Sequence, residues 1–425
     1  MRVDLIVSNI GQLLTCATDD GPKRLAKMRD VGEIANGAVA ISGGEFVAVG
    51  SSDEILRDFE TAEIIDAEGR VVCPGFVDPH THIVFAGDRL DEFELKIKGA
   101  DYLEILANGG GIISTVRKTR EASIATLIEL ATKRLDKMLA SGTTTCEIKT
   151  GYGLDTETEL KMLDVIADLD KSHPIDVVTT FLAAHAVPPE FKENADAYVD
   201  LICDEMLPKA YARLLAGDGL TARPTFVDVF CEKNAFDVGQ SRRVLETAKA
   251  LGFGLKAHVD EFTNLGGSCL AIELGATSID HLDAISDEEV KILAESETVG
   301  IITPTVNFNF GSAHFADARK LIDAGCAIAL STDYNPGSSP CPSQPMAMSI
   351  ACRYQKLLPS EAINAATINA AFSIGLGDQF GSIEVGKVAD LVVLDTDDYR
   401  LAAYEFGGNL IKRVIKAGTV VYGSD

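Results

Sequence analysis

The chain has 425 residues, 46% of them hydrophobic, which is enough for one large core and a second, smaller one. Its formal net charge is −26, with 64 acidic and 38 basic residues, so it should repel nucleic acid and anionic membrane surfaces. No apolar stretch approaches the roughly 18 residues that cross a bilayer, and the N-terminal segment is a poor signal peptide. The nine cysteines are scattered without a CxxC spacing, which predicts reduced thiols and a cytoplasmic protein.

The two ends of the chain carry similar strand-like patterns. Near the N-terminus, apolar runs such as GAVAISGGEFVAVG (37–50) are bounded by glycine, as β-strands commonly are. Near the C-terminus, GSIEVGKVADLVVLD (381–395) has the same character. We therefore predict a small β-sandwich domain composed of residues 1–70 and 376–425, with the middle of the chain inserted into it.

The middle of the chain, residues 71–375, alternates between short apolar runs and helical patterns. The runs are 71–83, 143–150, 175–185, 224–232, 253–261, 276–282, 298–304 and 326–333, of which TVGIITP (298–304) has the weakest strand pattern. Continuous apolar runs separated by helices are typical of a parallel sheet buried on both faces. About eight such units over this length predict a TIM-like (β/α)8 barrel.

Two histidines stand one residue apart in PGFVDPHTH (74–82), where the first barrel strand should end. In a strand, residues i and i+2 point to the same side, so His80 and His82 can bind one metal ion together. His185, His258 and His281 also fall at or near predicted strand ends, and Asp333 ends the last one. These ends meet at the face where barrel enzymes carry their active sites.

Imidazoles combined with a carboxylate favour one divalent metal ion, with zinc the first choice and iron the second. Such an ion lowers the pKa of a bound water from about 15.7 towards about 7, which produces hydroxide at neutral pH. The other two histidines, His173 and His314, lie in a connector and in a loop, so we assign them no catalytic role.

These motifs resemble the amidohydrolase superfamily. The similarity begins with PGFVDPHTH, ends with STD (331–333) and GSIEVGKVADLVVLD, and extends over essentially the whole chain. More specific segments are FAGDR (85–89), EIKTGYGL (147–154), FLAAHAVP (181–188), HVDEF (258–262) and STDYNPGSS (331–339). Within the superfamily they resemble the members that hydrolyse 4-imidazolone-5-propionate to N-formimidoyl-L-glutamate in histidine degradation. The resemblance implies that metal-activated hydroxide attacks the carbonyl carbon of the imidazolone ring.

The resemblance also implies roles for individual residues. The metal ligands would be His80, His82, His258 and Asp333. The substrate contacts would come from Arg89, Tyr152, His185, Glu261, Asn335, Gly337 and Ser338. His281 would position the attacking water, and His185 could stabilise the oxyanion. Independently of the resemblance, Arg89 suits the anionic tail of such a substrate, because a guanidinium binds a carboxylate with two parallel hydrogen bonds.

Several alternatives remain open from the sequence. The proton carrier could be Asp333, Glu261 or His281. The chain could instead be another mononuclear cyclic-amide hydrolase, or an aminohydrolase, of the same superfamily. Members with two metals usually carry a modified lysine at the end of the fourth strand, where this chain has Cys231 and Glu232, with Lys233 just beyond. A non-catalytic barrel is disfavoured because all four candidate ligands are present. We expect a homodimer that acts on a small molecule.

Overall fold

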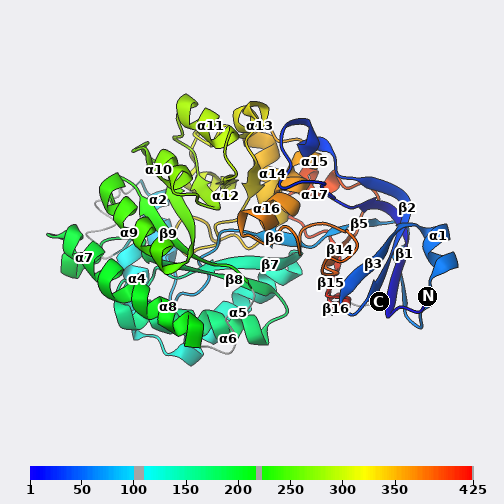
Figure 1. Ribbon diagram of the computed structural model, residues 1–425, viewed down its shortest axis with the longest axis horizontal. Helices are drawn as coiled ribbons and strands as arrows, with labels where there is room; N and C mark the ends of the chain where they lie inside the picture. Colours follow the sequence, from blue (N-terminus) through cyan, green and yellow to red (C-terminus); the bar gives the residue numbers. More distant parts are fainter. Residues whose placement is uncertain (100–109, 217–222, 424–425) are drawn as a thin grey trace.

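Two separate eight-stranded sheets organise the chain. The computed structural model describes residues 1–99, 110–216 and 223–423. Figure 1 shows a large body of strands and surrounding helices, with a smaller sheet at one end. The blue N-terminal strands and the orange-to-red C-terminal strands lie together in that smaller sheet, near both chain ends. The predicted barrel, and a second β-structure built from strands of both chain ends, are therefore confirmed.

The barrel strands are parallel and follow the order of the chain from β6 to β13. They are β6 (Phe76–Asp78), β7 (Thr143–Lys149), β8 (Asp176–Ala184), β9 (Thr225–Cys231), β10 (Gly254–Val259), β11 (Ser278–His281), β12 (Val299–Ile302) and β13 (Ile328–Leu330). Beyond the ends of β6 and β13, a parallel bridge between Thr81 and Tyr334 nearly closes the ring. The weakest predicted strand, TVGIITP, is confirmed as β12.

Helices cover the outside of the barrel (Figure 1). In chain order they are α2 (Leu90–Ile97), α4 (Ile112–Glu121), α5 (Ile124–Ala140), α6 (Thr156–Ser172), α7 (Ala195–Leu201), α8 (Leu207–Ala216), α9 (Val238–Leu251), α10 (Gly267–Glu273), α11 (Asp287–Ala294), α12 (Pro304–Phe310), α13 (Ala318–Ala324), α14 (Gln344–Tyr354), α15 (Pro359–Ala365) and α16 (Ile368–Ser373). Helix α5 illustrates how they form. Ser123 caps its N-terminus, and Leu127, Ala131 and Leu135 recur every four residues on its buried face. Among the described residues, no helix is both long and apolar enough to span a membrane.

The smaller sheet is mixed and is continuous in its hydrogen bonding. Its strands are β1 (Leu5–Leu14), β2 (Glu33–Ser42), β3 (Glu45–Ser51), β4 (Ile64–Asp66), β5 (Val71–Pro74), β14 (Leu391–Leu394), β15 (Ile411–Lys416) and β16 (Thr419–Tyr422). Strand β5 pairs with β1 on one side and with β14 on the other, so it joins the two chain ends. The small β-structure predicted from both chain ends is therefore present, and its ladders link all these strands into one mixed sheet. The short helices α1 (Ser52–Asp58), η1 (Leu25–Arg29) and α17 (Leu401–Tyr404) belong to the terminal regions, and η2 (Pro189–Phe191) and the π-helical turn η3 (Ile202–Met206) to the barrel.

The first predicted barrel run, 71–83, divides at Gly75 between the two sheets. Its first part is β5 of the small sheet, and its second part is β6 of the barrel. Gly75 packs so closely on the second barrel strand that an added Cβ would lie 2.1 Å from Thr144 Oγ1. The backbone N–H of Gly75 donates to Asp390 O, which ties the junction to the C-terminal segment.

Candidate active site

His80 and His82 lie just beyond the end of β6, and not within the strand as the spacing had suggested. Asp78, the last residue of β6, fixes this segment against the end of β13. Its carboxylate accepts hydrogen bonds from Ser331 Oγ at 2.6 Å and from the backbone N–H of Thr332 at 3.1 Å. The chain therefore leaves the strand along a fixed path that buries both histidine rings.

The side chains predicted to hold a metal ion converge on one point. His80 Nε2 lies 3.1 Å from His82 Nε2, which lies 3.4 Å from His258 Nε2. Asp333 Oδ1 lies 3.6 Å from His80 Nε2 and 3.5 Å from His82 Nε2. Four ligands around a zinc ion at about 2.0–2.1 Å would be separated by about 3.3 Å, so the spacing of these atoms fits a tetrahedral site.

Burial prepares these groups to bind a cation. It lowers the pKa of His80 and of His82 well below the ordinary value, so both rings are neutral and each keeps a lone pair. Burial also raises the pKa of Asp333 well above the ordinary value. A divalent ion would reverse that effect by compensating the carboxylate charge. Neutral imidazoles with a carboxylate are a donor set suited to zinc or iron.

Two aspartates that were not predicted from the sequence lie next to the Nδ1 atoms of two of these histidines. Asp280 Oδ2 lies 2.6 Å from His80 Nδ1, and Asp228 Oδ2 lies 3.0 Å from His258 Nδ1. The second contact is an ion-pair distance without hydrogen-bond alignment. Because the Asp280 carboxylate accepts from His80 Nδ1, that ring presents its Nε2 lone pair to the metal site, and the carboxylate of Asp228 near His258 Nδ1 favours the same tautomer there. The only hint in the sequence was an acidic residue inside each of two apolar strands, β9 and β11.

A cavity of about 370 Å³ opens beside the converging atoms. Every residue predicted to bind the metal or substrate lines it except His80, which is fully buried behind the others. The lining residues are His82, Arg89, Glu92, Lys96, Gly111, Ile112, Tyr152, His185, Phe230, His258, Glu261, Phe262, His281, Phe310, Asp333, Asn335, Gly337 and Ser338. Phe230, His258 and His281 lie in strands β9, β10 and β11, and the other lining residues lie in segments that follow barrel strands.

Arg89 lies at the outer part of this cavity, among polar partners. Its Nε donates to Thr115 Oγ1 at 3.0 Å, and its Nη1 pairs with Glu92 at 3.0 Å. Glu92 also pairs with Lys96 at 3.0 Å. Gly337 packs against the guanidinium, so closely that an added Cβ would lie 3.1 Å from Arg89 Cζ. Arg89 was predicted from the sequence, whereas Glu92 and Lys96, which follow it on α2 at helical spacing, were not.

His185 stacks on His82, with ring centroids 5.0 Å apart and planes 18° from parallel. Its Nδ1 lies 3.0 Å from the carbonyl oxygen of Gly151, which can only accept, so Nδ1 carries the proton. Burial lowers the pKa of His185 to about 3, and the neutral ring therefore presents an unprotonated Nε2. The Tyr152 ring lies 5.4 Å from the His185 ring and completes one aromatic wall.

Glu261 and His281 face each other across the cavity, with 3.9 Å between Glu261 Oε2 and His281 Nε2. Thr303 Oγ1 lies 3.1 Å from His281 Nδ1. His281 Nε2 has no hydrogen-bond partner among the described residues. Burial, together with the charge of Asp333, raises the pKa of Glu261 well above its ordinary value. This pair is therefore placed to exchange protons with a bound molecule.

The loop after Asp333 is held by its own asparagine. Asn335 Nδ2 donates to Asp333 Oδ1 at 3.0 Å, and Asn335 Oδ1 accepts from the backbone N–H groups of Gly337 and Ser338 at 2.8 Å each. The amide of Asn335 is thus committed within the loop. It orients the carboxylate of Asp333 and sets the shape of the cavity wall.

Lys233, which left a two-metal site open in the sequence analysis, is exposed and does not line the cavity. Strand β9 ends at the buried Cys231. Within the described ranges, no lysine thus occupies the position from which a modified side chain would bridge two metal ions.

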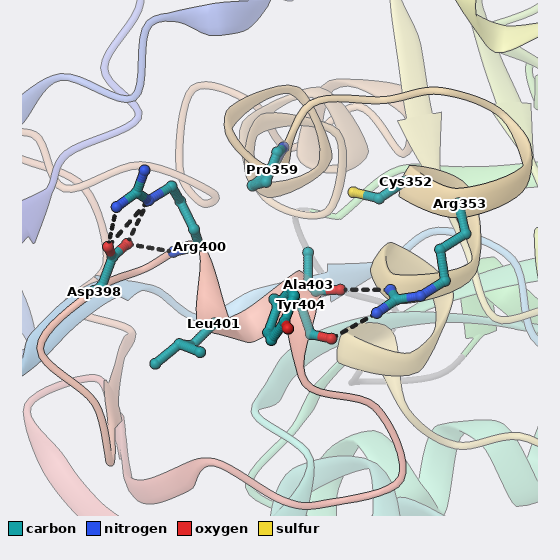
Figure 2. A pocket seen from close by; sticks show the side chains of 8 residues that line it. All are labelled: Cys352, Arg353, Pro359, Asp398, Arg400, Leu401, Ala403 and Tyr404. Carbon is teal, nitrogen blue, oxygen red and sulfur yellow. Dashed lines mark hydrogen bonds and ion pairs between the residues drawn. The ribbon is translucent and has the colours of Figure 1, made fainter.

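A second hollow of about 590 Å³ lies among α14, α15 and α17 (Figure 2). None of its lining residues lines the active-site cavity. Its charged groups already have partners: Arg353 donates to the carbonyl oxygens of Ala403 and Tyr404 at 2.9 and 2.6 Å, and Arg400 pairs with Asp398. Figure 2 shows Arg353 and Arg400 engaged in these contacts. We assign no chemistry to it.

Comparison with known proteins identifies the family. Two models of the amidohydrolase family match residues 63–206 and 238–421. An imidazolonepropionase from Chloroflexus aggregans is 53% identical over 421 residues, covering 98% of each chain. One from Herpetosiphon aurantiacus is 52% identical, covering 99% of this chain and 97% of the relative. The chain belongs to the imidazolonepropionase family.

Solved structures similar to this imidazolonepropionase family member share its fold at low identity. An adenosine deaminase from Xanthomonas campestris with bound zinc superposes with a TM-score of 0.73 at 21% identity, covering 99% of this chain and 93% of that one. The Escherichia coli guanine deaminase gives a TM-score of 0.73 at 17% identity, covering 99% of both chains. These similarities support the barrel with its additional sheet and carry no information about the substrate.

Proposed function

We propose that the protein hydrolyses the cyclic amide bond of 4-imidazolone-5-propionate to give N-formimidoyl-L-glutamate. The observation that carries the proposal is the convergence of three imidazole nitrogens and Asp333 Oδ1 beside a cavity that also holds Arg89. Full-length relatives at about half identity bear the name imidazolonepropionase, which supports this substrate. The planar ring of the substrate would suit the wall of histidine rings, and its carboxylate tail would suit the guanidinium of Arg89.

His80, His82, His258 and Asp333 would hold the metal ion, with zinc preferred over iron because the spacing suits a tetrahedral site. When bound, such an ion acts as a Lewis acid that makes water nucleophilic at neutral pH and polarises a carbonyl group. One ion per chain is proposed, because the exposed side chain of Lys233 is not near the cavity.

The substrate would lie with its ring between the metal ligands and the wall formed by Tyr152 and His185, and its carboxylate at Arg89. Because Nε2 of neutral His185 is unprotonated, it can accept a hydrogen bond from a ring N–H group of the substrate. This replaces the oxyanion role suggested by the sequence, for which a donor would be needed. Gly337 and Ser338 would contribute the opposite wall, in the shape that Asn335 imposes on their loop.

Glu261 is the proposed main proton carrier among the three candidates. Burial raises its pKa well above the ordinary value, which makes its carboxylate a stronger base towards the attacking water. As a carboxylate it takes a proton from the attacking water, and it then gives that proton to the ring nitrogen as the C–N bond breaks. His281, 3.9 Å away, would orient the water. Asp333 is less suited to the role, because its Oδ1 faces the metal site and accepts from Asn335.

A substrate panel tests this function. The purified protein would be mixed with 4-imidazolone-5-propionate, with a different cyclic amide and with an aminopurine, while ring absorbance and the mass of the product are followed. We expect turnover of the first compound, with N-formimidoyl-L-glutamate as the product. If the protein turned over the other cyclic amide or the aminopurine but not the imidazolone, it would have the activity of a different member of the superfamily.

We further propose a cytoplasmic homodimer. The nine cysteines are all free thiols, which suits a reducing compartment. Two exposed aromatic side chains would support an interface: Tyr404, which lines the hollow, and Phe406, whose ring centroid lies 4.8 Å from Cζ of Arg353. Light scattering coupled to size-exclusion chromatography tests the dimer, and a mass of one chain, 45.2 kDa, would refute it.

A further inference from the structure

A layer of buried charged side chains lies inside the barrel, behind the metal ligands. Its members come from strands β7, β9, β10 and β11 and have no exposed surface: Glu147, Lys149, Asp228, Lys256 and Asp280. None of them lines the active-site cavity, so none can contact the substrate. Burying five such groups opposes folding unless each is well paired, which raises the question of what this layer does.

Lys149 is at the centre of this layer. Its Nζ lies 2.7 Å from Asp228 Oδ2, 2.8 Å from Glu147 Oε2 and 3.4 Å from Asp280 Oδ2. Burial disfavours the ammonium charge, but these three carboxylates together raise the pKa of Lys149 above its ordinary value. Lys149 is therefore a permanent cation in the interior of the barrel.

Two of the three carboxylates are the ones that hold metal-binding histidines. The same Oδ2 atom of Asp280 that faces Lys149 lies 2.6 Å from His80 Nδ1. The same Oδ2 atom of Asp228 lies 3.0 Å from His258 Nδ1. One ammonium thus joins two carboxylate–histidine pairs, and these pairs approach the metal site from β9, β10 and β11 and from the segment after β6.

Carboxylate oxygens of Asp228 and Asp280 lie within 4.8 Å of each other, and the charges of both Lys256 and Lys149 oppose the rise that burial causes in the pKa of Asp280. The layer holds three carboxylates and two ammonium groups, and the other ammonium, Lys256, pairs with Glu147 at 3.0 Å and donates to Pro79 O at 2.9 Å. Lys256 has no contact within 4.0 Å of Asp228 or Asp280 among the ion pairs of the described residues. Among the described residues, Lys149 is the ammonium that lies within 4.0 Å of both aspartates.

We propose that Lys149 is a positioning residue of the metal centre. It fixes Asp228 and Asp280 so that they orient His258 and His80, and it thereby sets the affinity for the metal ion. The proposal rests on the function proposed above only for the ligand set, and metal binding can be measured without any substrate.

The test compares Lys149→Met with Lys256→Met in the full chain. Both substitutions remove a fully buried ammonium from the same layer, but only the first removes the bridge between the aspartates. The zinc dissociation constant would be measured by competition with a chromogenic chelator, and the cobalt-substituted absorption spectrum would report ligand geometry. We expect Lys149→Met to weaken zinc binding by about 10- to 100-fold and to alter the cobalt spectrum, since groups that orient ligands have effects of this size.

The control variant should lose less than about tenfold in zinc affinity and keep the wild-type cobalt spectrum. In the Lys149 variant kcat should fall while KM stays near the wild-type value, because Lys149 does not line the substrate cavity. Equal losses of zinc affinity in the two variants would overturn the proposal, since that result indicates a general effect of removing buried charge.

A second variant guards against a failure to fold. Glu147→Gln combined with Lys149→Met removes one charge of each sign, so the net charge of the layer is unchanged. If the double variant folds and still binds zinc weakly, the loss of the bridge is responsible. Wild-type zinc affinity in the double variant would refute the proposal, and so would a failure of both Lys149 variants to fold, because Lys149 would then serve the barrel and not the metal.

Discussion

At the scale of single residues, Glu261 carries the proposed proton transfer. Its side chain is largely buried, and burial together with Asp333 raises its pKa well above the ordinary 4.5. A general base works only when ionised, so kcat should fall as the pH drops through this raised pKa. The acid limb of the pH profile should therefore lie above 4.5.

Glu261→Gln should remove this limb and lower kcat by about 10²- to 10⁴-fold, the usual contribution of a general base. Its metal content should stay at the wild-type value. Steady-state kinetics between pH 4.5 and 9 on the metal-loaded enzyme would check both points. A variant that kept the acid limb together with near-normal turnover would transfer the role to His281 or Asp333.

Arg89 is predicted to bind the carboxylate tail of the substrate. Arg89→Met should raise KM by about 10- to 100-fold, because one charge-assisted contact is worth about 1.5–3 kcal/mol. Arg117→Met, which removes an exposed arginine outside the cavity, serves as the control. The loss should disappear with an imidazolone that lacks the propionate chain, and an equal loss with both compounds would assign Arg89 a structural role.

The sequence predicted the residues of this site better than their interactions. His80, His82, His258 and Asp333 could be found because each follows or ends an apolar run, and parallel strands bring such ends together. Asp228 and Asp280 could not be paired with particular histidines, because the pairing depends on the register between distant strands. Lys149 was hidden for the same reason, although a lysine ending a fully buried strand was a visible anomaly.

At the scale of elements, the loop between β7 and α6 holds Tyr152 in the cavity. The carboxylate of Glu159, in the first turn of α6, accepts from the backbone N–H groups of Gly151, Gly153 and Leu154 at 3.0, 2.7 and 2.9 Å. Glu159 is fully buried and has no cationic partner among the described ion pairs. Glu159 thus holds the N–H groups of the loop, while Arg120 donates to the carbonyl oxygens of Gly153 and Leu154 at 2.7 and 3.2 Å.

Glu159→Gln should leave at least one of these N–H groups unpaired, because an amide presents only one accepting oxygen. We expect the free energy of unfolding to fall by about 1–3 kcal/mol, and KM to rise as Tyr152 loses its position. Denaturant unfolding and steady-state kinetics would measure both effects. The control is Glu157→Gln, an exposed neighbour on the same helix, and equal effects in the two variants would contradict this account.

Element types followed from sequence pattern, but element boundaries did not. The run 71–83 looked like one strand because its residues are apolar throughout, yet Gly75 divides it between two sheets. What decides the division is the close approach of Thr144 to Gly75, a contact between segments far apart in sequence. His80 and His82 therefore converge on one point as predicted, but they lie in the segment after β6 and not in a strand.

At the scale of the whole molecule, the two sheets are joined through Gly75. Gly75→Ala would place a methyl group 2.1 Å from Thr144 Oγ1, so we expect the free energy of unfolding to fall by about 1–3 kcal/mol from overpacking. Gly50→Ala is the control, because its Cβ would meet nothing closer than 3.4 Å. Calorimetry would compare the two variants. An unchanged melting temperature for Gly75→Ala would contradict the prediction, because the backbone near Thr144 would then have shifted to accommodate the methyl group.

The central claim is that a single metal ion at His80, His82, His258 and Asp333 makes this protein an imidazolone hydrolase. The most direct test strips the metal with a chelator, adds back zinc in measured equivalents and follows the ring absorbance of 4-imidazolone-5-propionate. We predict that activity vanishes in the stripped protein and returns in proportion to added zinc, up to a plateau at one equivalent per chain. Full activity after stripping, or a plateau only at two equivalents, would contradict the account.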